Sequence, residues 1–210
     1  MNRKQFLYND LRQEDDDEPE KEDKRDDLKM LNKKLEKFFF EKRSVYLWGV
    51  VNDKSAREIV SKFLLLDADK PGEEIKFYIN SPGGVVTSGM VMYDTMKMIK
   101  SPVSTICMGL AASMGSILLS GGVKEKRFIY PHGEVMIHQP SIGGHIQGVS
   151  TDLEIQAKQT RRVKEIGAKI LAENCGKTVE QIMKDFDRDY WMDADEAIKY
   201  GIVDKLIDKL

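Results

Sequence analysis

The chain has 210 residues, of which 41% are hydrophobic and 32% charged, and its formal net charge is −2. This length suits one domain with a sizeable core, and the near-neutral charge argues against nucleic acid or an anionic membrane as the main partner. No apolar run approaches the ~20 residues that span a bilayer, and no apolar signal-peptide core is found, so we expect a cytoplasmic protein. Cys107 and Cys175 lack the spacing of a metal site or a redox motif, which indicates reduced thiols.

Residues 1–27 are expected to form a mobile acidic arm. The segment Glu14–Asp23 reads EDDDEPEKED, so like charges repel and nothing apolar can be buried. It is either a solvated tail or a regulatory or docking segment. Apolar residues then recur at helical spacing over residues 28–43, which predicts a helix. The side chains of Phe38–Phe40 cannot all face one core, so a contact between subunits is plausible there.

Beyond Arg43, predicted strands and helices alternate, which indicates an α/β domain with a largely parallel sheet. The expected strands cover residues 45–51, 75–80, 103–108, 127–130, 135–138 and 202–206. The expected helices are one capped by Asn52 or Asp53, one over residues 87–100, one over residues 109–122, a long one capped at Ser150 or Thr151 and closed by Gly176, and two short ones capped by Thr178 and Asp193.

Gly109–Gly122 reads GLAASMGSILLSGG and surrounds Ser113 with small side chains. A core position would favour larger residues, so we expect a substrate to approach the backbone here. A serine nucleophile needs a base to take its proton, and only His132, His138 and His145 offer an imidazole. His138 ends an apolar strand, at a sheet edge where active sites of α/β folds collect. A structural role for this histidine is an equal alternative on the pattern alone.

Such a base also needs a carboxylate to hold its tautomer and to stabilise the imidazolium. Asp185, Asp187 and Asp189 lie in the segment DFDRDYWM, and spacing alone does not choose among them. Asp189 precedes an aromatic pair and is expected to be the most shielded. A tetrahedral intermediate further needs two N–H donors. The Pro-Gly-Gly turn within residues 80–84 suits one donor, although such a turn is usually only a turn, and the N–H of Met114 suits the other.

Four segments in this order, FYINSPGG, DTMKMIKSPVSTICMGLAASMGS, VMIHQP and STDLEI, resemble the ClpP family, the proteolytic subunit of the Clp protease. The resemblance covers about residues 44–206. It implies that Ser113 is the nucleophile, His138 the general base and Asp189 the orienting acid of a serine endopeptidase.

The resemblance also implies that the N–H groups of Gly84 and Met114 form the oxyanion hole. An extended substrate would pair with the chain by strand addition, which reads backbone more than side chains and implies broad specificity. The residues implied in this pairing are Gly84, Val85, Val86, Ser141, Ile142 and Gly143.

The fold implied by the resemblance is crotonase-like, with stacked β-β-α units and a protruding handle helix at about residues 141–176. Residues 28–210 would form the peptidase domain. Its subunits would assemble into two stacked heptameric rings, a tetradecamer with a closed chamber. A ring-shaped AAA+ ATPase unfoldase of the Clp family would feed in polypeptides, which would be cut to short peptides. Peptide hydrolysis needs only water, so no cofactor or metal is expected, and neither nucleic acid nor a membrane is an expected partner.

Two features depart from the family pattern. The acidic arm occupies the place of an apolar segment that usually forms gating loops and contacts the ATPase. The segment SIGGHIQGVSTD is about two residues longer than the common spacing.

Three alternatives compete with a serine peptidase. The first is a binding or scaffold subunit whose triad is present but not aligned. The second is a crotonase-type acyl-CoA enzyme, which shares the oxyanion chemistry, although nothing in the sequence suggests a nucleotide site. The third is a Ser/Lys peptidase of the kind that degrades signal peptides, which would need a membrane anchor.

Overall fold

The structure is a computed structural model that describes residues 19–141 and 148–207, in two units that meet between Phe38 and Phe39. The first unit holds most of helix α1 (Pro19–Glu41), which begins earlier than the sequence predicts, inside the expected arm. Proline at the first helical position followed by acidic residues is a favourable helix start, which accounts for the difference. The rest of the predicted arm, residues 1–18, lies outside the described residues. The exposed apolar side chains of this unit are Leu28, Met30, Leu31, Leu35 and Phe38.

The second unit is built around a mixed sheet, and this confirms the predicted α/β class. Five of the described strands run parallel in the order β1-β2-β3-β4-β7, and β5 and β6 branch from β3. The strands are β1 (Ser44–Trp48), β2 (Ile75–Ser81), β3 (Val103–Ala112), β4 (Arg127–Ile129), β5 (Glu134–Ile137), β6 (Tyr190–Met192) and β7 (Lys205–Leu206).

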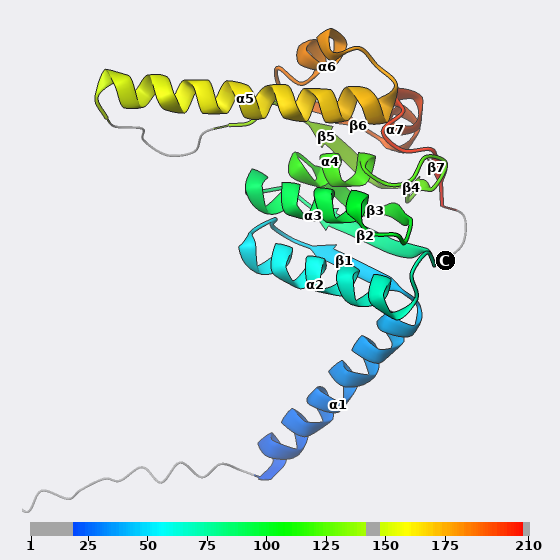
Figure 1. Cartoon of the computed structure of the whole chain (residues 1–210). Coiled ribbons are helices and arrows are strands. Elements are labelled where there is room, and N and C mark those ends of the chain that lie inside the picture. The colour runs from blue at the N-terminus through cyan, green and yellow to red at the C-terminus, as the bar shows by residue number, and fades with distance from the viewer. Residues whose placement is uncertain (1–18, 142–147, 208–210) are drawn as a thin grey trace, which may run out of the picture. The chain divides into compact units, whose positions relative to one another are not determined.

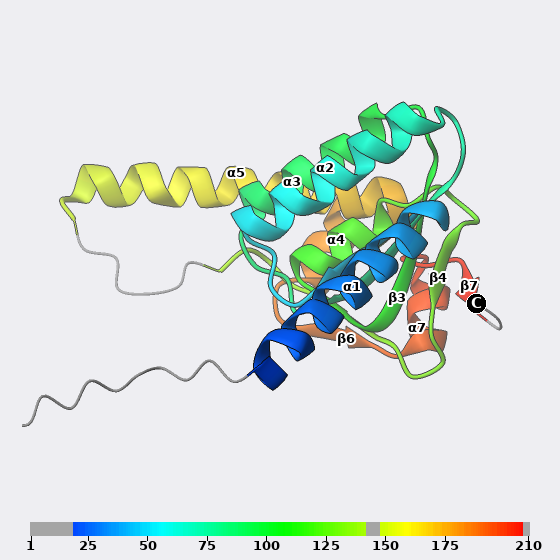
Figure 2. The ribbon, with the colours of Figure 1, turned by 90° about the horizontal axis from the view of Figure 1, so that it is seen from below.

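Helices α2, α3, α4 and α5 pack against one another in this order, so they form a layer beside the strands (Figure 1 and Figure 2). The core lies between this layer and the sheet. Phe63 of α2, for example, meets Phe77 of β2 edge to face at 5.2 Å between ring centroids. The helices of this unit are α2 (Asp53–Asp69), α3 (Val86–Met98), α4 (Met114–Ser120), α5 (Ser150–Cys175), α6 (Val179–Asp185) and α7 (Ala194–Tyr200).

Local sequence signals account for several helix ends. Asn52 caps α2 in a reciprocal capping box with Ser55, and Asp193 caps α7 in the same way with Glu196. Gly176 closes α5 in the left-handed conformation that the sequence predicts. The start of α5 differs from the prediction, because Val149 stands at its N-cap without a side-chain hydrogen bond.

Strand β3 forks, and the fork sets the position of the site. Its first half pairs with β4 and its end, Leu110–Ala112, pairs with β5. The register between β2 and β3 shifts near Gly109, where the backbone has φ 109° and the side-chain oxygen of Asn80 accepts the N–H of Leu110. Such a bulge bends and re-aims a strand, and here it directs the end of β3 towards β5. Strand β6, which the sequence analysis did not predict, pairs antiparallel with β5.

Helix α5 packs on the domain through only one of its halves. Its buried residues, Gly167, Ala168, Leu171 and Ala172, all lie in the C-terminal half. The N-terminal half extends past the strands in both views and exposes Leu153 and Ile155 (Figure 1 and Figure 2). This shape agrees with the protruding handle implied by the family resemblance. No helix within the described ranges is long and apolar enough to cross a membrane.

Candidate active site

Strand register brings three of the predicted site residues to one place. Ala112, at the end of β3, pairs with Met136 of β5, so Ser113 leaves the sheet beside the end of β5. On the other side of β5, Ile137 pairs with Tyr190 of the antiparallel β6. Continuing this register by one residue places His138 opposite Asp189. The three side chains therefore lie at the ends of three neighbouring strands.

Ser113 occupies a sharp turn between β3 and α4. Its backbone has φ 54° and ψ −120°, a region that a residue with a side chain rarely adopts and that costs on the order of 1–3 kcal/mol. Its N–H donates to the carbonyl of Met136 at 2.8 Å, and its carbonyl accepts the hydroxyl of Ser116 at 2.6 Å. These bonds hold the turn, so the serine hydroxyl lies above the sheet edge rather than in the core.

The turn corrects the predicted helix over residues 109–122. Residues 109–112 belong to β3, and α4 begins only at Met114. The small residues also have a different reason from the one expected. A Cβ on Gly115 would lie 3.1 Å from the carbonyl oxygen of Ser81, and Ala111 is fully buried. Gly115 and Ala111 are therefore small because the start of α4 and the end of β3 both pack tightly against the end of β2.

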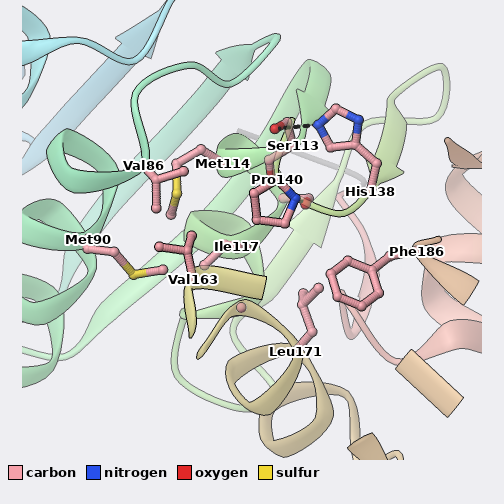
Figure 3. A pocket seen from close by; sticks show the side chains of 12 residues that line it. Val86, Met90, Ser113, Met114, Ile117, His138, Pro140, Val163, Leu171 and Phe186 are labelled. Atoms are coloured by element: carbon pink, nitrogen blue, oxygen red, sulfur yellow. Dashed lines mark hydrogen bonds between the residues drawn. The ribbon is translucent and has the colours of Figure 1, made fainter. Parts of the chain in front are cut away.

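The side chains of Ser113, His138 and Asp189 form a hydrogen-bonded chain. Nε2 of His138 lies 2.8 Å from Oγ of Ser113 (Figure 3). Nδ1 of the same ring lies 3.0 Å from Oδ1 of Asp189. Since the carboxylate only accepts, Nδ1 carries the proton and Nε2 accepts from the serine hydroxyl. This tautomer is the one in which an imidazole can take a proton from serine.

The expected reason for choosing Asp189 is wrong, because its side chain is 60% exposed. Asp185 is the more shielded carboxylate, and it accepts the hydroxyl of Tyr200 at 2.9 Å. Burial raises the pKa of Tyr200, and the neighbouring Asp185 adds to the rise, so this hydroxyl stays a donor. Asp187 accepts a hydrogen bond from Gln139. Register, and not shielding, therefore separates Asp189 from the other two carboxylates.

The Pro-Gly-Gly turn lies directly beside the Ser113 turn. A Cβ on Gly83 would come within 2.7 Å of the Ser113 Cβ and 2.8 Å of the Met114 nitrogen. Gly84 forms an isolated parallel bridge with Val51, in which the bonding partners are Gly83 and Val85. In such a bridge the N–H of the middle residue points away from the partner strand. The N–H of Gly84 is thus directed away from Val51, next to the turn that carries the N–H of Met114.

The predicted substrate-pairing residues have different surroundings. Val85 donates its N–H to the carbonyl of Val51 at 2.8 Å, so this N–H is not available to a substrate. Its carbonyl already accepts the N–H of Gly89, and its side chain is half exposed. Val86 is the first residue of α3 and contributes to the wall of a pocket described below. Ser141 is exposed. Ile142 and Gly143 lie outside the described residues.

An apolar pocket opens beside the serine and encloses about 430 Å³ of empty space, part of it open to solvent (Figure 3). Its walls come from α3, α4, α5 and the residue after α6, and Ser113 and His138 lie at one edge. Apart from these two and Ser116, the lining residues are apolar or lack a side chain: Val86, Met90, Met114, Ile117, Pro140, Val163, Gly167, Leu171 and Phe186. The pocket therefore offers an apolar surface next to the reactive hydroxyl.

The other candidates for nucleophile or base lie elsewhere. His132 is exposed in its turn, and His145 lies outside the described residues. Cys107 and Cys175 are free thiols, and burial raises the pKa of Cys107 to about 12 and that of Cys175 to about 11. Since the thiolate is the reactive form of cysteine, neither is suited to be a nucleophile near neutral pH.

Three neighbours of the site were missed by the sequence analysis: Gln139, Lys164 and Phe186. Gln139 directly follows His138 in the segment MIHQP, and that adjacency could have drawn attention to it. Lys164 and Phe186 carry no such local signal, because helix packing brings them to the site.

Comparison with known protein families adds an independent finding. Residues 28–210 match the Clp protease family, and this range covers most of the chain and includes every predicted site residue. The match supports a peptidase of the ClpP type, in agreement with a hydroxyl, an imidazole and a carboxylate in hydrogen-bonding sequence beside an apolar pocket. The chain therefore belongs to the Clp protease family.

Proposed function

We propose that this protein is a serine endopeptidase that cleaves unfolded polypeptides through an acyl-enzyme. Ser113 is the nucleophile, His138 the general base and Asp189 the residue that orients it. The observation that carries the proposal is the pair of hydrogen bonds at 2.8 and 3.0 Å that links the three side chains. An acyl-CoA enzyme has no need of this arrangement.

The proposed reaction follows from the positions of the groups. His138 takes the proton of the Ser113 hydroxyl as the oxygen attacks the peptide carbonyl. The new oxyanion is held by the N–H groups of Gly84 and Met114, each worth roughly 3 kcal/mol. The C–N bond then breaks, and the imidazolium returns its proton to the leaving amine. Water, activated by the same histidine, hydrolyses the ester and frees Ser113.

The apolar pocket suggests which residue precedes the cleaved bond. Because Ser113 and His138 lie at its edge, the side chain next to the attacked carbonyl is the one that enters it. Burying a Leu or Met side chain there favours binding by about 1.5–3 kcal/mol, whereas a charged side chain would lose its hydration. We expect cleavage mainly after large apolar residues, with little selection along the rest of an extended substrate.

The family match further supports self-assembly and delivery of substrates by a partner. We propose two stacked heptameric rings joined through the N-terminal half of α5, with an AAA+ unfoldase of the Clp family supplying polypeptides and the cytoplasm as the site of action. The exposed Leu153 and Ile155 on the projecting part of α5 support its role as the contact. Enclosing the serine in a chamber would protect folded proteins from it.

The test combines peptide hydrolysis with labelling by a fluorophosphonate, a probe that reacts with activated serines. Ser113→Ala should abolish labelling and reduce hydrolysis of a short peptide with Leu before the cleaved bond by ~10⁴-fold or more, because the triad acts as a unit. Ser61→Ala, at an exposed position on α2, is the matched control and should retain both. A wild type that assembles but neither labels nor cleaves would favour the scaffold alternative.

A further inference from the structure

Gln139, the residue after the proposed base, is tied to the turn that precedes the proposed acid. Its backbone N–H donates to the carbonyl of Phe186 at 2.6 Å. Its side-chain Nε2 donates to the carbonyl of Asp187 at 2.7 Å and to Oδ1 of Asp187 at 3.2 Å. The two sides of the His138–Asp189 pair are therefore joined a second time, through their chain neighbours.

Lys164 of helix α5 contacts both Gln139 and Asp187. Its Nζ donates to Oε1 of Gln139 at 2.8 Å and lies 3.7 Å from Oδ1 of Asp187. The same Nζ lies 5.7 Å from the centroid of the Phe186 ring, which forms part of the pocket wall. The lysine side chain is 26% exposed, so it is held between the helix and the turn rather than extended into solvent.

The cation reinforces the way the Gln139 amide faces. An ammonium group only donates, so it attracts the amide oxygen and directs the amide NH₂ towards Asp187. The carbonyl and carboxylate of Asp187 favour the same orientation, because a flipped amide would set its oxygen against theirs. Lys164 also lies near Oδ1 of Asp187, so a charge supplied by another element strengthens the hold on the turn.

Asp189 needs such a hold because its own side chain is 60% exposed. In the described part of the chain, the contact shown for its carboxylate is the one to His138. A hydrogen bond in so exposed a place is weak against competition from water. The position of the carboxylate is therefore set by the backbone of the turn, which Gln139 fixes through Phe186 and Asp187.

We propose that Lys164 is a positioning residue for the reaction: it orients the Gln139 amide, which holds the 186–189 turn and so keeps Asp189 against His138. The inference rests on the proposed function and adds to it a link between α5 and the triad. Because Lys164 lies in the half of α5 that packs on the domain, the position of this helix bears directly on the alignment of the base.

The test measures kcat and KM of the assembled full-length protein with the Leu-containing peptide, alongside fluorophosphonate labelling. Lys164→Met should lower kcat and the labelling rate about 10-fold or more, with KM within about 2-fold, because the pocket is kept while the base is misaligned. Lys164→Arg keeps a cation and its donors and should restore most of kcat. Lys169→Met, an exposed lysine on the same helix, is the charge-matched control and should behave as wild type.

A second variant addresses the case in which Lys164→Met does not fold or assemble. Gln139→Glu keeps an acceptor for Lys164 but places a carboxylate against Asp187, so kcat should fall at least as far as in Lys164→Met. Thermal melting and sedimentation verify that each variant is folded and assembled.

Several outcomes would overturn the inference. They are wild-type kcat in Lys164→Met or Gln139→Glu, a loss confined to KM, or an equal loss in Lys164→Arg and Lys164→Met. A wild type that neither cleaves nor labels would instead sink the proposed function, and the inference with it, so the two failures are distinguishable.

Discussion

At the scale of single residues, two turns of unusual backbone geometry determine the site. Ser113 has φ 54°, and Gly83 beside it has φ 89° with no room for a Cβ. The Ser113 turn occupies the space that a side chain at position 83 would need, so this position requires a glycine. In the proposed mechanism, this close approach brings the N–H of Gly84 next to that of Met114, and both donate to the oxyanion of the substrate.

Gly83→Ala should damage both stability and activity. The left-handed φ costs an alanine about 1 kcal/mol, and the contacts at 2.7–2.8 Å add roughly 1–3 kcal/mol of strain. The strain is relieved by moving Ser113 and Met114, so hydrolysis should fall by about 10²-fold. Urea unfolding and peptide hydrolysis measure the two effects.

Gly72→Ala is the matched control for that variant. Gly72 has nearly the same φ, 85°, but nothing lies within 4 Å of its Cβ position. It should lose only the conformational part, about 1 kcal/mol of unfolding free energy, and keep its kcat. Equal kcat in both variants would show that the Ser113 turn tolerates a side chain at position 83, which contradicts this prediction.

At the scale of elements, one buried arginine joins strand β4 to the segment before β7 and to the end of α5. Arg127 of β4 pairs with Asp204, just before β7, and donates to the carbonyl of Asn174 near the end of α5. The side chains of the ion pair are only 4% and 14% exposed. Burial alone would raise the pKa of the Asp204 carboxyl, but the hydrogen bonds from Arg127 outweigh it and the pKa is lowered.

Asp204→Asn should destabilise the fold in a pH-dependent way. A lowered carboxyl pKa means that ionised Asp204 stabilises the folded state fully above the ordinary value of about 3.9. This stabilisation decreases below that value and is lost as the pH falls through the lower pKa of the folded state. At about pH 7 the variant leaves a buried Arg127 without its ion partner and should lose about 3 kcal/mol of unfolding free energy. Below about pH 4 the difference from wild type should narrow, as measured by urea unfolding at fixed protein concentration.

Glu58→Gln is the control for Asp204→Asn, because Glu58 pairs with Lys62 on the exposed surface of α2. It should change the unfolding free energy by about 0.5 kcal/mol or less at either pH. A gap between Asp204→Asn and wild type that did not change with pH would show that shape, and not charge, is the reason for the loss.

At the scale of the whole molecule, the unit Phe39–Leu210 leaves apolar side chains uncovered. The projecting half of α5 exposes Leu153 and Ile155, two large apolar side chains at positions where a helix surrounded by solvent usually has polar residues. Exposed apolar side chains on a helix that extends beyond its own domain are typical of a surface that pairs with another chain. This feature is the structural basis for the proposed assembly.

Ile155→Asp should lower the particle mass. Ile155 is 60% exposed in the single chain, so the change should hardly affect folding, but a carboxylate buried in an apolar contact is unfavourable. Sedimentation velocity at several concentrations measures the result. Ser61→Asp, which adds the same charge on the exposed face of α2, should leave the mass unchanged. A mass equal to wild type for Ile155→Asp would place the contact elsewhere.

Local patterns in the sequence were enough to predict the alternation of strands and helices, a cap at Asn52 or Asp53, the cap at Asp193, and the candidates Ser113 and His138. They failed where distant segments decide. The pattern predicts helix at the end of β3 because it does not reveal the bulge at Gly109, which is shaped by Asn80, a residue of another strand. The three aspartates could not be separated because the choice depends on the pairing of β5 with β6. Lys164 was missed because the packing of α5 on the domain, and not any local pattern, brings it to the site.

The buried thiol of Cys107 gives the molecule an internal reporter of its own motion. Cys107 lies in the strand that leads to Ser113, whereas Cys175, at the end of α5, is partly exposed. Because burial raises the pKa of Cys107 to about 12, an alkylating reagent reacts with it only when the surrounding strands open. The alkylation rate of Cys107 would therefore time the fluctuations of the sheet in the unaltered protein, with partly exposed Cys175 as an internal reference.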